Sequence, residues 1–510
     1  MEAQKMPELL SLFNCPQCDE PFISESALHN IKLPAVLRLC MSEEQADALS
    51  VFIQRPSDME TILNQQSFFK EFLYSDTLVD LFKKTQNELL IATQLVEQYE
   101  KEKSTELRHF LFYRLMEVYL TALTDIADMA GTAQSSIMSA FIARVKTFCQ
   151  ENAVEHAMQD MGSIRKALKD VTSQSFEVRL YGSFMTDYDA ISTVENAPTL
   201  DKQLHALFSD IGMSIAVPPP NKEMKNDMFN TYFGLLIKNN KQVSGILSSY
   251  YTRHKDLFAH IIPLDISDIS TIISIHTLFD YLNKQDIPLC FPGISPTRVA
   301  HIYDCHDLSL LTQKIPNIVP NDFICNEDNG IFILTGINSG GKTTYLRGIG
   351  IAIAFFASGL FVPATSATIP YYDHMEALFA IRDNTRGGER FLQEKQMVND
   401  AMARISATSL LLVNEIFSSI DEKTALAEYS HVIRFLQQKA CHCLLITHLH
   451  SLARGVAPYA DIVSLVAMIG ENSERLYKIK RSQGRSSNVL EILQKYALTP
   501  AQLTAERSPL

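Results

Sequence analysis

Proline and glycine are scarce in a long part of this 510-residue sequence. Residues 57–197 contain no proline and three glycines. Because both residue types interrupt helices, their scarcity permits long ones. Apolar residues recur at helical spacing in residues 78–96 and 107–122, and again in 222–261 and 265–284 after a proline-rich break. The sequence therefore predicts an all-helical region in the first part of the chain.

Cysteine is also scarce, with nine residues at irregular spacing. This odd number fits reduced thiols in a cytoplasmic protein better than a disulfide scaffold. The N-terminus lacks the basic and then apolar order of a signal peptide. Cys15 and Cys18, followed by His29 and Cys40, loosely resemble a zinc knuckle, but no second C-x-x-C pair exists. We therefore expect free thiols and leave zinc at Cys15 and Cys18 open.

A long apolar run that could span a membrane is missing. Residues 348–372 carry no charge, yet Pro363 and Pro370 would break a helix there. About 15 continuous apolar positions remain, which is more typical of a buried core helix than of a bilayer crossing. We expect no membrane partner.

Basic residues are not in excess either, since the formal net charge is −13. Residues 291–510 carry 20 basic and 20 acidic side chains, so the remaining 25 basic and 38 acidic ones lie in residues 1–290. No basic footprint for nucleic acid is visible in these counts, and DNA binding would need a local patch.

The second part of the chain alternates strands, glycine loops and helices. Residues 330–335, 410–413 and 443–446 are short apolar runs typical of buried strands. We therefore predict an all-helical core and lever region followed by an α/β domain with a mostly parallel sheet. The expected parts are an N-terminal segment (1–50), a helical domain (51–292) and an α/β domain (293–510).

A phosphate-binding motif, G-x-x-x-x-G-K-[ST], follows the first predicted strand and opens a helix. Its residues are Gly336, Ile337, Asn338, Ser339, Gly340, Gly341, Lys342 and Thr343, with Thr344 after it. Glycines let the backbone wrap around phosphates, and the helix N-terminus adds N–H donors. We expect Lys342, in a solvent-facing loop, to reach the phosphates of ATP, and the Thr343 hydroxyl to bind Mg²⁺. The motif predicts a P-loop NTPase domain.

Two further strand ends supply candidate catalytic groups. Residues 410–413 are followed by Asn414 and Glu415, where P-loop ATPases place a magnesium-orienting carboxylate and a second acid. We expect Asn414 near Mg²⁺ and Glu415 to polarise the attacking water. His448 follows the third strand and could hydrogen-bond a γ-phosphate or the same water.

These residues together resemble the MutS family of DNA mismatch-repair ATPases. Residues 335–347 look like the family's T-G-P-N-x-G-G-K-S-T-x-x-R, in which the asparagine and double glycine are more specific than a generic phosphate loop. Residues 361–364, 411–417 and 446–448 are similar to later family segments, and residues 56–66 look like the start of its helical core. The resemblance is strongest over residues 296–490.

The resemblance implies a helical core and lever joined to an ABC-like ATPase domain. It also implies two composite nucleotide sites in a homodimer that acts on DNA, with ATP and Mg²⁺ as cofactors. The family's mismatch reader carries a Phe-x-Glu wedge; Phe69, Lys70 and Glu71 match its letters but lie in a helical stretch. We therefore expect a shortened MutS-related ATPase without that reader.

Two positions and one turn depart from the family pattern. Asn414 stands where an acidic residue is usual, and Glu389 stands where the family's signature loop carries a serine that contacts the partner's nucleotide. A carboxylate there would repel a γ-phosphate unless Arg390 takes over the contact. The glycine-rich turn after Glu415 is replaced by residues 417–421. These departures predict slow hydrolysis.

Two functional interpretations remain open. The first is a MutS-like ATPase, a nucleotide-gated dimer acting on DNA in mismatch repair or branched-DNA processing. The alternative is a slow nucleotide-gated protein that binds a protein partner, which the acidic residues 1–290 favour. A chromosome-maintenance type of ATPase is weaker, because no long heptad coiled coil separates the motifs.

Overall fold

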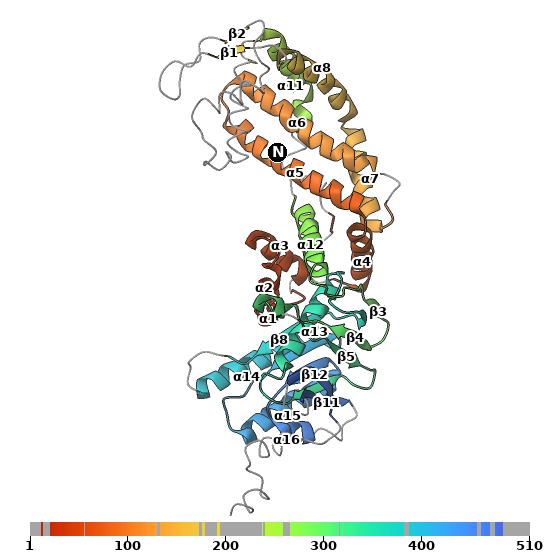
Figure 1. Ribbon diagram of the computed structural model, residues 1–510, viewed down its shortest axis with the longest axis vertical. Helices are drawn as coiled ribbons and strands as arrows, with labels where there is room; N and C mark the ends of the chain where they lie inside the picture. The colour runs from red at the N-terminus through yellow and green to blue at the C-terminus, as the bar shows by residue number, and fades with distance from the viewer. Residues whose placement is uncertain are drawn as a thin grey trace, which may run out of the picture. The chain divides into compact units, whose positions relative to one another are not determined.

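The computed structural model describes most of the chain. The chain consists of two compact units, built from helices and sheets (Figure 1). The first unit comprises Met1–Phe13, Thr77–Gln134 and Met138–Ile269, and the second Asn14–Asp76, Ser135–Ile137 and Ser270–Leu510. The described residues are 12–13, 21–55, 57–129, 133–152, 154–172, 176–178, 191–193, 237, 240–258, 266–315, 317–381, 387–455, 461–469 and 475–482. The predicted three-part division at residues 50 and 292 stays a prediction.

The first unit consists mainly of long helices. They are α5 (Asp76–Lys101), α6 (Thr105–Asp128), α7 (Ser136–Glu151), α8 (Val154–Thr172) and α11 (Lys241–Phe258), with a small antiparallel pair β1 (Phe176–Val178) and β2 (Ile191–Thr193). Helix α6 packs against both α8 and α11. The helices predicted at 78–96 and 107–122 are confirmed by α5 and α6. The one predicted at 222–261 is confirmed over α11, and residues 222–236 lie outside the described residues.

Among the residues that the structure describes, five helices of the second unit precede its sheets in the chain. They are α1 (Glu25–Asn30), α2 (Leu33–Leu37), α3 (Glu43–Gln54), α4 (Met59–Leu73) and α12 (Ser267–Asn283). Helix α12 confirms the stretch predicted at 265–284. Phe69 lies within α4 and is fully buried, as expected for a core residue rather than an exposed wedge.

A six-stranded sheet forms the centre of the second unit. Its spatial order is β12 (Arg475–Arg481), β11 (Ile462–Ile469), β6 (Ile331–Thr335), β10 (His442–Ile446), β9 (Ser409–Asn414) and β8 (His374–Phe379). All neighbouring pairs are parallel except β11 with β12. Strands β6, β9 and β10 confirm the three predicted buried strands and the mostly parallel sheet.

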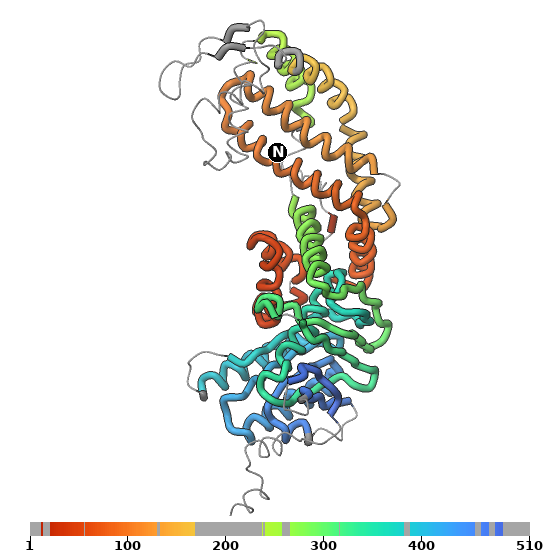
Figure 2. The backbone as a smooth tube through the Cα atoms, viewed as in Figure 1, coloured from red at the N-terminus to blue at the C-terminus, as the bar shows by residue number. Residues whose placement is uncertain are grey.

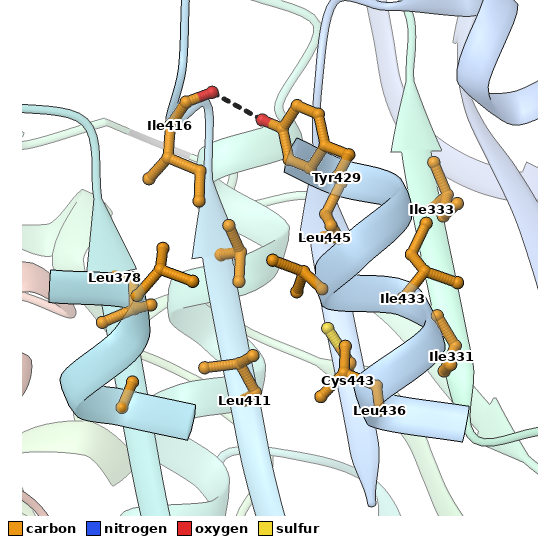
Figure 3. Close-up of a cluster of buried hydrophobic side chains, with 14 of the residues drawn as sticks. Ile331, Ile333, Leu378, Leu411, Ile416, Tyr429, Ile433, Leu436, Cys443 and Leu445 are labelled. Atoms are coloured by element: carbon orange, nitrogen blue, oxygen red, sulfur yellow. Dashed lines mark hydrogen bonds between the residues drawn. The ribbon is translucent and has the colours of Figure 1, made fainter. Parts of the chain in front are cut away.

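Helices cover both faces of this sheet. Helix α13 (Lys342–Ala357) packs against β9 and β10 on one face. The side chains of alternate positions on β6, β9 and β10 pack on the other face against α14 (Gly387–Arg404), α15 (Glu422–Lys439) and α16 (His450–Gly455). Figure 3 shows this cluster, in which Leu411, Leu445 and Ile333 of the strands share one apolar layer with Ile433 of α15. Because successive side chains of a strand point to opposite faces of the sheet, each of these strands contributes to the apolar layers on both faces.

A second, four-stranded sheet lies in the same unit. Its order is β3 (Gly293–Ser295), β7 (Ser366–Pro370), β4 (Ala300–Cys305) and β5 (Asn321–Cys325), with the 3-10 turn η1 (Leu308–Gln313) between β4 and β5.

The segment of residues 21–55 packs onto the α/β fold (Figure 2). Asn30 donates its side-chain amide to the carbonyl of Ala377 on β8, and Arg347 of α13 donates to the carbonyl of Asn30. A Cβ added at Gly350 would lie 2.8 Å from Ile31 and 3.0 Å from Leu412. Helix α13 is thus held tightly between α1 and β9.

The uncharged run at residues 348–372 begins in the core and is exposed at Thr365, Ser366 and Thr368. Helix α13 covers its first part, and every residue from Gly348 to Ala357 is buried. Among the described residues, no helix is both long and apolar enough to cross a membrane.

Candidate active site

Parallel pairing brings three strand ends to one edge of the six-stranded sheet. In the register, Ile446 of β10 lies opposite Leu334 of β6 and Asn414 of β9. The pairing continues past the strands, since the Glu415 amide donates to the Ile446 carbonyl at 3.0 Å and the Thr447 amide donates to the Leu334 carbonyl at 3.1 Å. The loop after β6, Glu415 and His448 therefore leave the sheet at the same level.

The loop between β6 and α13 depends on glycine at two points. Gly336 has φ 134°, and a Cβ there would lie 3.1 Å from the side chain of Ala467 on β11. Gly341 is the N-cap of α13 at φ 89°, so the helix begins with a left-handed residue and no side-chain cap. Asn338 and Ser339 are exposed at the tip of the loop, and Thr344 is half-buried at the helix start. The first backbone amides of α13 are thereby left for a ligand.

The loop is solvent-facing at Asn338 and Ser339, as expected, but Lys342 itself is buried. Only 4% of the residue is exposed, because its ammonium donates to the carbonyls of Gly336 and Ile337, each at 3.0 Å. Burial lowers the pKa of Lys342, and the carboxylate of Glu415, 3.8 Å away, opposes that shift. Lys342 thus binds two carbonyls of its own loop, and its ammonium lies near Glu415 at the end of β9.

The Thr343 hydroxyl and the Asn414 side chain are in direct contact. Thr343 Oγ1 donates to Asn414 Oδ1 at 3.1 Å, although the residues are 71 positions apart. Asn414 is 4% exposed at the end of β9. Both oxygens are hard ligands of the kind Mg²⁺ takes, so the pair fits that ion, though it offers no charge. Among the described residues, no group of three or more His, Cys, Asp or Glu side chains gathers as a metal site.

Glu415 lies at the centre of the polar side chains. Its Oε1 is 3.0 Å from His448 Nε2 and 3.8 Å from Lys342 Nζ. The backbone of Glu415 has φ 55°, in the left-handed region that a non-glycine residue seldom adopts. A carboxylate between an imidazole and an ammonium, beside a glycine loop at a helix N-terminus, can orient water against a bound phosphate.

The start of α14 contacts the turn that follows Glu415. Arg390 donates to Glu394 at 3.0 Å and to the hydroxyl of Ser418 at 3.1 Å, so its guanidinium is engaged within the chain. Glu389, by contrast, is exposed. Residues 382–386 lie outside the described residues, as do Cys15 and Cys18.

Two residues near the site carried no recognised signal in the sequence. The first is Tyr477 on β12, which is 45% exposed. A Cβ added at Gly341 would lie 3.5 Å from its ring. Glu394 is fully buried beneath the Glu415 turn. Its spacing of four from Arg390 on a helix was the one available hint.

Asp421 is the next acidic residue after Glu415 and does not stand in for the missing acid at position 414. Its side chain caps α15 by accepting from the backbone amide of Thr424.

Comparison with known proteins places a family match over this unit. Residues 332–507 match the family model described as MutS domain V. A DNA mismatch repair protein MutS of Lactobacillus delbrueckii subsp. bulgaricus is 32% identical over 136 residues, covering 26% of this chain and 16% of the relative.

Two other proteins with the same name are similar over longer segments. That of Pseudothermotoga lettingae is 29% identical over 179 residues, which are 34% of this chain and 22% of the relative. That of Fervidobacterium nodosum is 26% identical over 216 residues, which are 41% of this chain and 25% of the relative. The chain thus spans no more than about a quarter of the length of these relatives.

Proposed function

We propose that this chain, which belongs to the MutS family through its domain V, is a Mg²⁺-dependent ATPase that acts on DNA as a nucleotide-gated homodimer. The observation that carries the proposal is the meeting of Lys342, Thr343, Asn414, Glu415 and His448 at one sheet edge. Thr343 is hydrogen-bonded to Asn414, and the Glu415 carboxylate lies 3.0 Å from His448 and 3.8 Å from Lys342. Chance would seldom bring a phosphate-loop lysine, two oxygen ligands, a carboxylate and an imidazole together in this way.

Phosphate binding rests on the loop and on Lys342. In our proposal the ammonium exchanges the carbonyls of Gly336 and Ile337 for phosphate oxygens, which bind a point charge more strongly. The amides at the start of α13 add donors and the positive end of the helix dipole. The exposed ring of Tyr477 lies beside the same helix start and offers an apolar surface to the rest of the nucleotide.

Hydrolysis rests on Glu415. Its carboxylate accepts a proton from the attacking water or orients that water, while His448 holds Oε1 from the other side. Thr343 and Asn414 would hold Mg²⁺, which supplies charge neutralisation on the phosphates when bound. Because neither residue brings a negative charge, we propose near-normal ATP affinity with slow turnover.

DNA and dimerisation enter through the family alone. The relatives are named for DNA mismatch repair, and they are longer than the matched segments. The acidic excess in residues 1–290 favours the alternative, a protein partner instead of DNA. The helical unit and the proposed ATPase domain are compatible with either partner, DNA or protein.

We predict that Glu415→Gln keeps ATP binding and slows hydrolysis by about 100-fold or more, because an amide cannot accept the proton. The variant should accumulate as a dimer in sedimentation runs with ATP and Mg²⁺. Glu422→Gln is the control, since Glu422 is an exposed carboxylate at the start of α15 bonded to Ser451. An unchanged rate removes Glu415 from catalysis, and a monomer under every nucleotide condition removes the composite site.

A second prediction concerns Asn414. Asn414→Asp should lower the Mg²⁺ concentration for half-maximal ATPase rate by about three- to tenfold and raise the rate, because it adds a charge beside Thr343. Asp421→Asn should leave the Mg²⁺ requirement unchanged, since Asp421 caps α15. Titrating Mg²⁺ against rate decides the matter: superimposable curves for wild type and Asn414→Asp leave position 414 without a part in metal binding.

A third prediction separates DNA from a protein partner. Duplex, branched and mismatched DNA are titrated against the full chain from 50 to 200 mM salt. If the chain contacts six to ten DNA phosphates, affinity should fall by about 10³ to 10⁵ across that range. No binding of any of the three at 50 mM salt would contradict the DNA function and favour the protein partner.

A further inference from the structure

The turn that carries Glu415 has an unusual backbone. Glu415 has φ 55° and Phe417 has φ 58°, so two non-glycine residues adopt the left-handed region within three positions. Such conformations are strained for non-glycine residues and persist only where surrounding contacts enforce them. The turn therefore needs partners that hold it.

The strongest of these partners is Glu394, about two turns into α14. Its side chain is fully buried, and Oε2 accepts the backbone amide of Phe417 at 2.7 Å. Its Oε1 accepts from Arg390 Nε at 3.0 Å and from the amide of Ile381 at 3.1 Å. A buried carboxylate with three donors, one of them a guanidinium, is a strong and directional anchor.

Two more contacts hold the same turn. Arg390 reaches past Glu394 to the hydroxyl of Ser418 at 3.1 Å. From α15, the Tyr429 hydroxyl donates to the carbonyl of Ile416 at 2.6 Å, the dashed contact in Figure 3. The ring of Phe417 packs against those of Phe391 and Tyr429. Residues 416, 417 and 418 are thus each fixed from a neighbouring helix.

We propose that Glu394 is a positioning residue that, with Arg390, holds the turn after β9 so that the Glu415 carboxylate stays directed at the phosphate loop. This inference rests on the proposed ATPase function. Through Ile381, the same carboxylate also holds the segment that leaves β8. Glu394 therefore joins two ends of parallel strands, β8 and β9, to the start of α14.

The chain offers a matched control for a purely structural role. Glu376 on β8 is also a buried carboxylate, 3% exposed. It lies 2.7 Å from Arg404 Nε and 2.8 Å from His374 Nε2. It is also a carboxylate buried beside the same sheet, but its partners Arg404 and His374 lie outside the Glu415 turn. Glu376→Gln removes a buried charge without releasing that turn.

The test compares Glu394→Gln with Glu376→Gln in the full chain, by steady-state ATPase kinetics and thermal unfolding. Glu394→Gln should lower kcat by about 100-fold, with KM within about twofold, since a misplacement of the order of 1 Å has that effect. Glu376→Gln should lose a comparable amount of Tm and keep kcat within about twofold. An unchanged kcat in Glu394→Gln, or an equal loss in both variants, overturns the proposal.

Amide hydrogen exchange gives a second readout that needs no hydrolysis. Exchange in residues 415–418 should accelerate by about tenfold or more in Glu394→Gln and stay unchanged in Glu376→Gln. If wild type hydrolyses no ATP, the proposed function fails, while faster exchange still supports the hold of Glu394 on the turn after β9. Unchanged exchange overturns that role of Glu394 alone.

If Glu394→Gln does not fold, Arg390→Ala takes its place. The arginine is partly exposed, and its removal frees Ser418 and one side of Glu394. It should lower kcat in the same direction by about tenfold. Full activity in a folded Arg390→Ala variant would contradict the proposal.

Discussion

Parallel register between β6, β10 and β9 is the constraint on which the candidate site depends. Because Leu334, Ile446 and Asn414 lie level with one another, the residues that follow them must emerge together. A shift of two residues in either pair would move Glu415 or His448 by about 7 Å along the strand and separate the carboxylate from the lysine. Helices α13 and α15 pack on opposite faces of the sheet and form two apolar layers with it. These layers fix the register, because any odd shift would turn buried side chains to the wrong face.

The polar residues at this edge are held as firmly as the apolar core beneath them. Lys342 donates to loop carbonyls, and the Glu415 carboxylate lies between Lys342 and His448. Glu394 fixes the turn that follows Glu415. Buried polar groups of this kind are stable only when their hydrogen bonds are satisfied. The site is therefore preorganised, which is what transition-state stabilisation by fixed charges requires.

Much of this could be predicted from local sequence. The three apolar strands and the G-x-x-x-x-G-K-[ST] loop are short-range patterns, and their strand and helix context is confirmed. The burial of Lys342 could not be predicted, because it depends on carbonyl groups whose direction the letters do not encode. Glu394 and Tyr477 were missed for a related reason: each acts on the site from a segment more than 20 residues away along the chain. The packing of residues 21–55 on α13 likewise joins positions more than 300 apart.

The proposed function depends above all on the binding of a nucleotide by Lys342 in the loop before α13. Calorimetric titration of ATP with Mg²⁺ into wild type and Lys342→Ala tests it most directly, with circular dichroism to show that the variant is folded, because the lysine is buried. Wild type should bind one nucleotide per chain, and the variant should bind about 100-fold or more weakly, because the charge held against the phosphates is removed. Equal affinity in the two proteins, or no heat of binding with wild type, would contradict it.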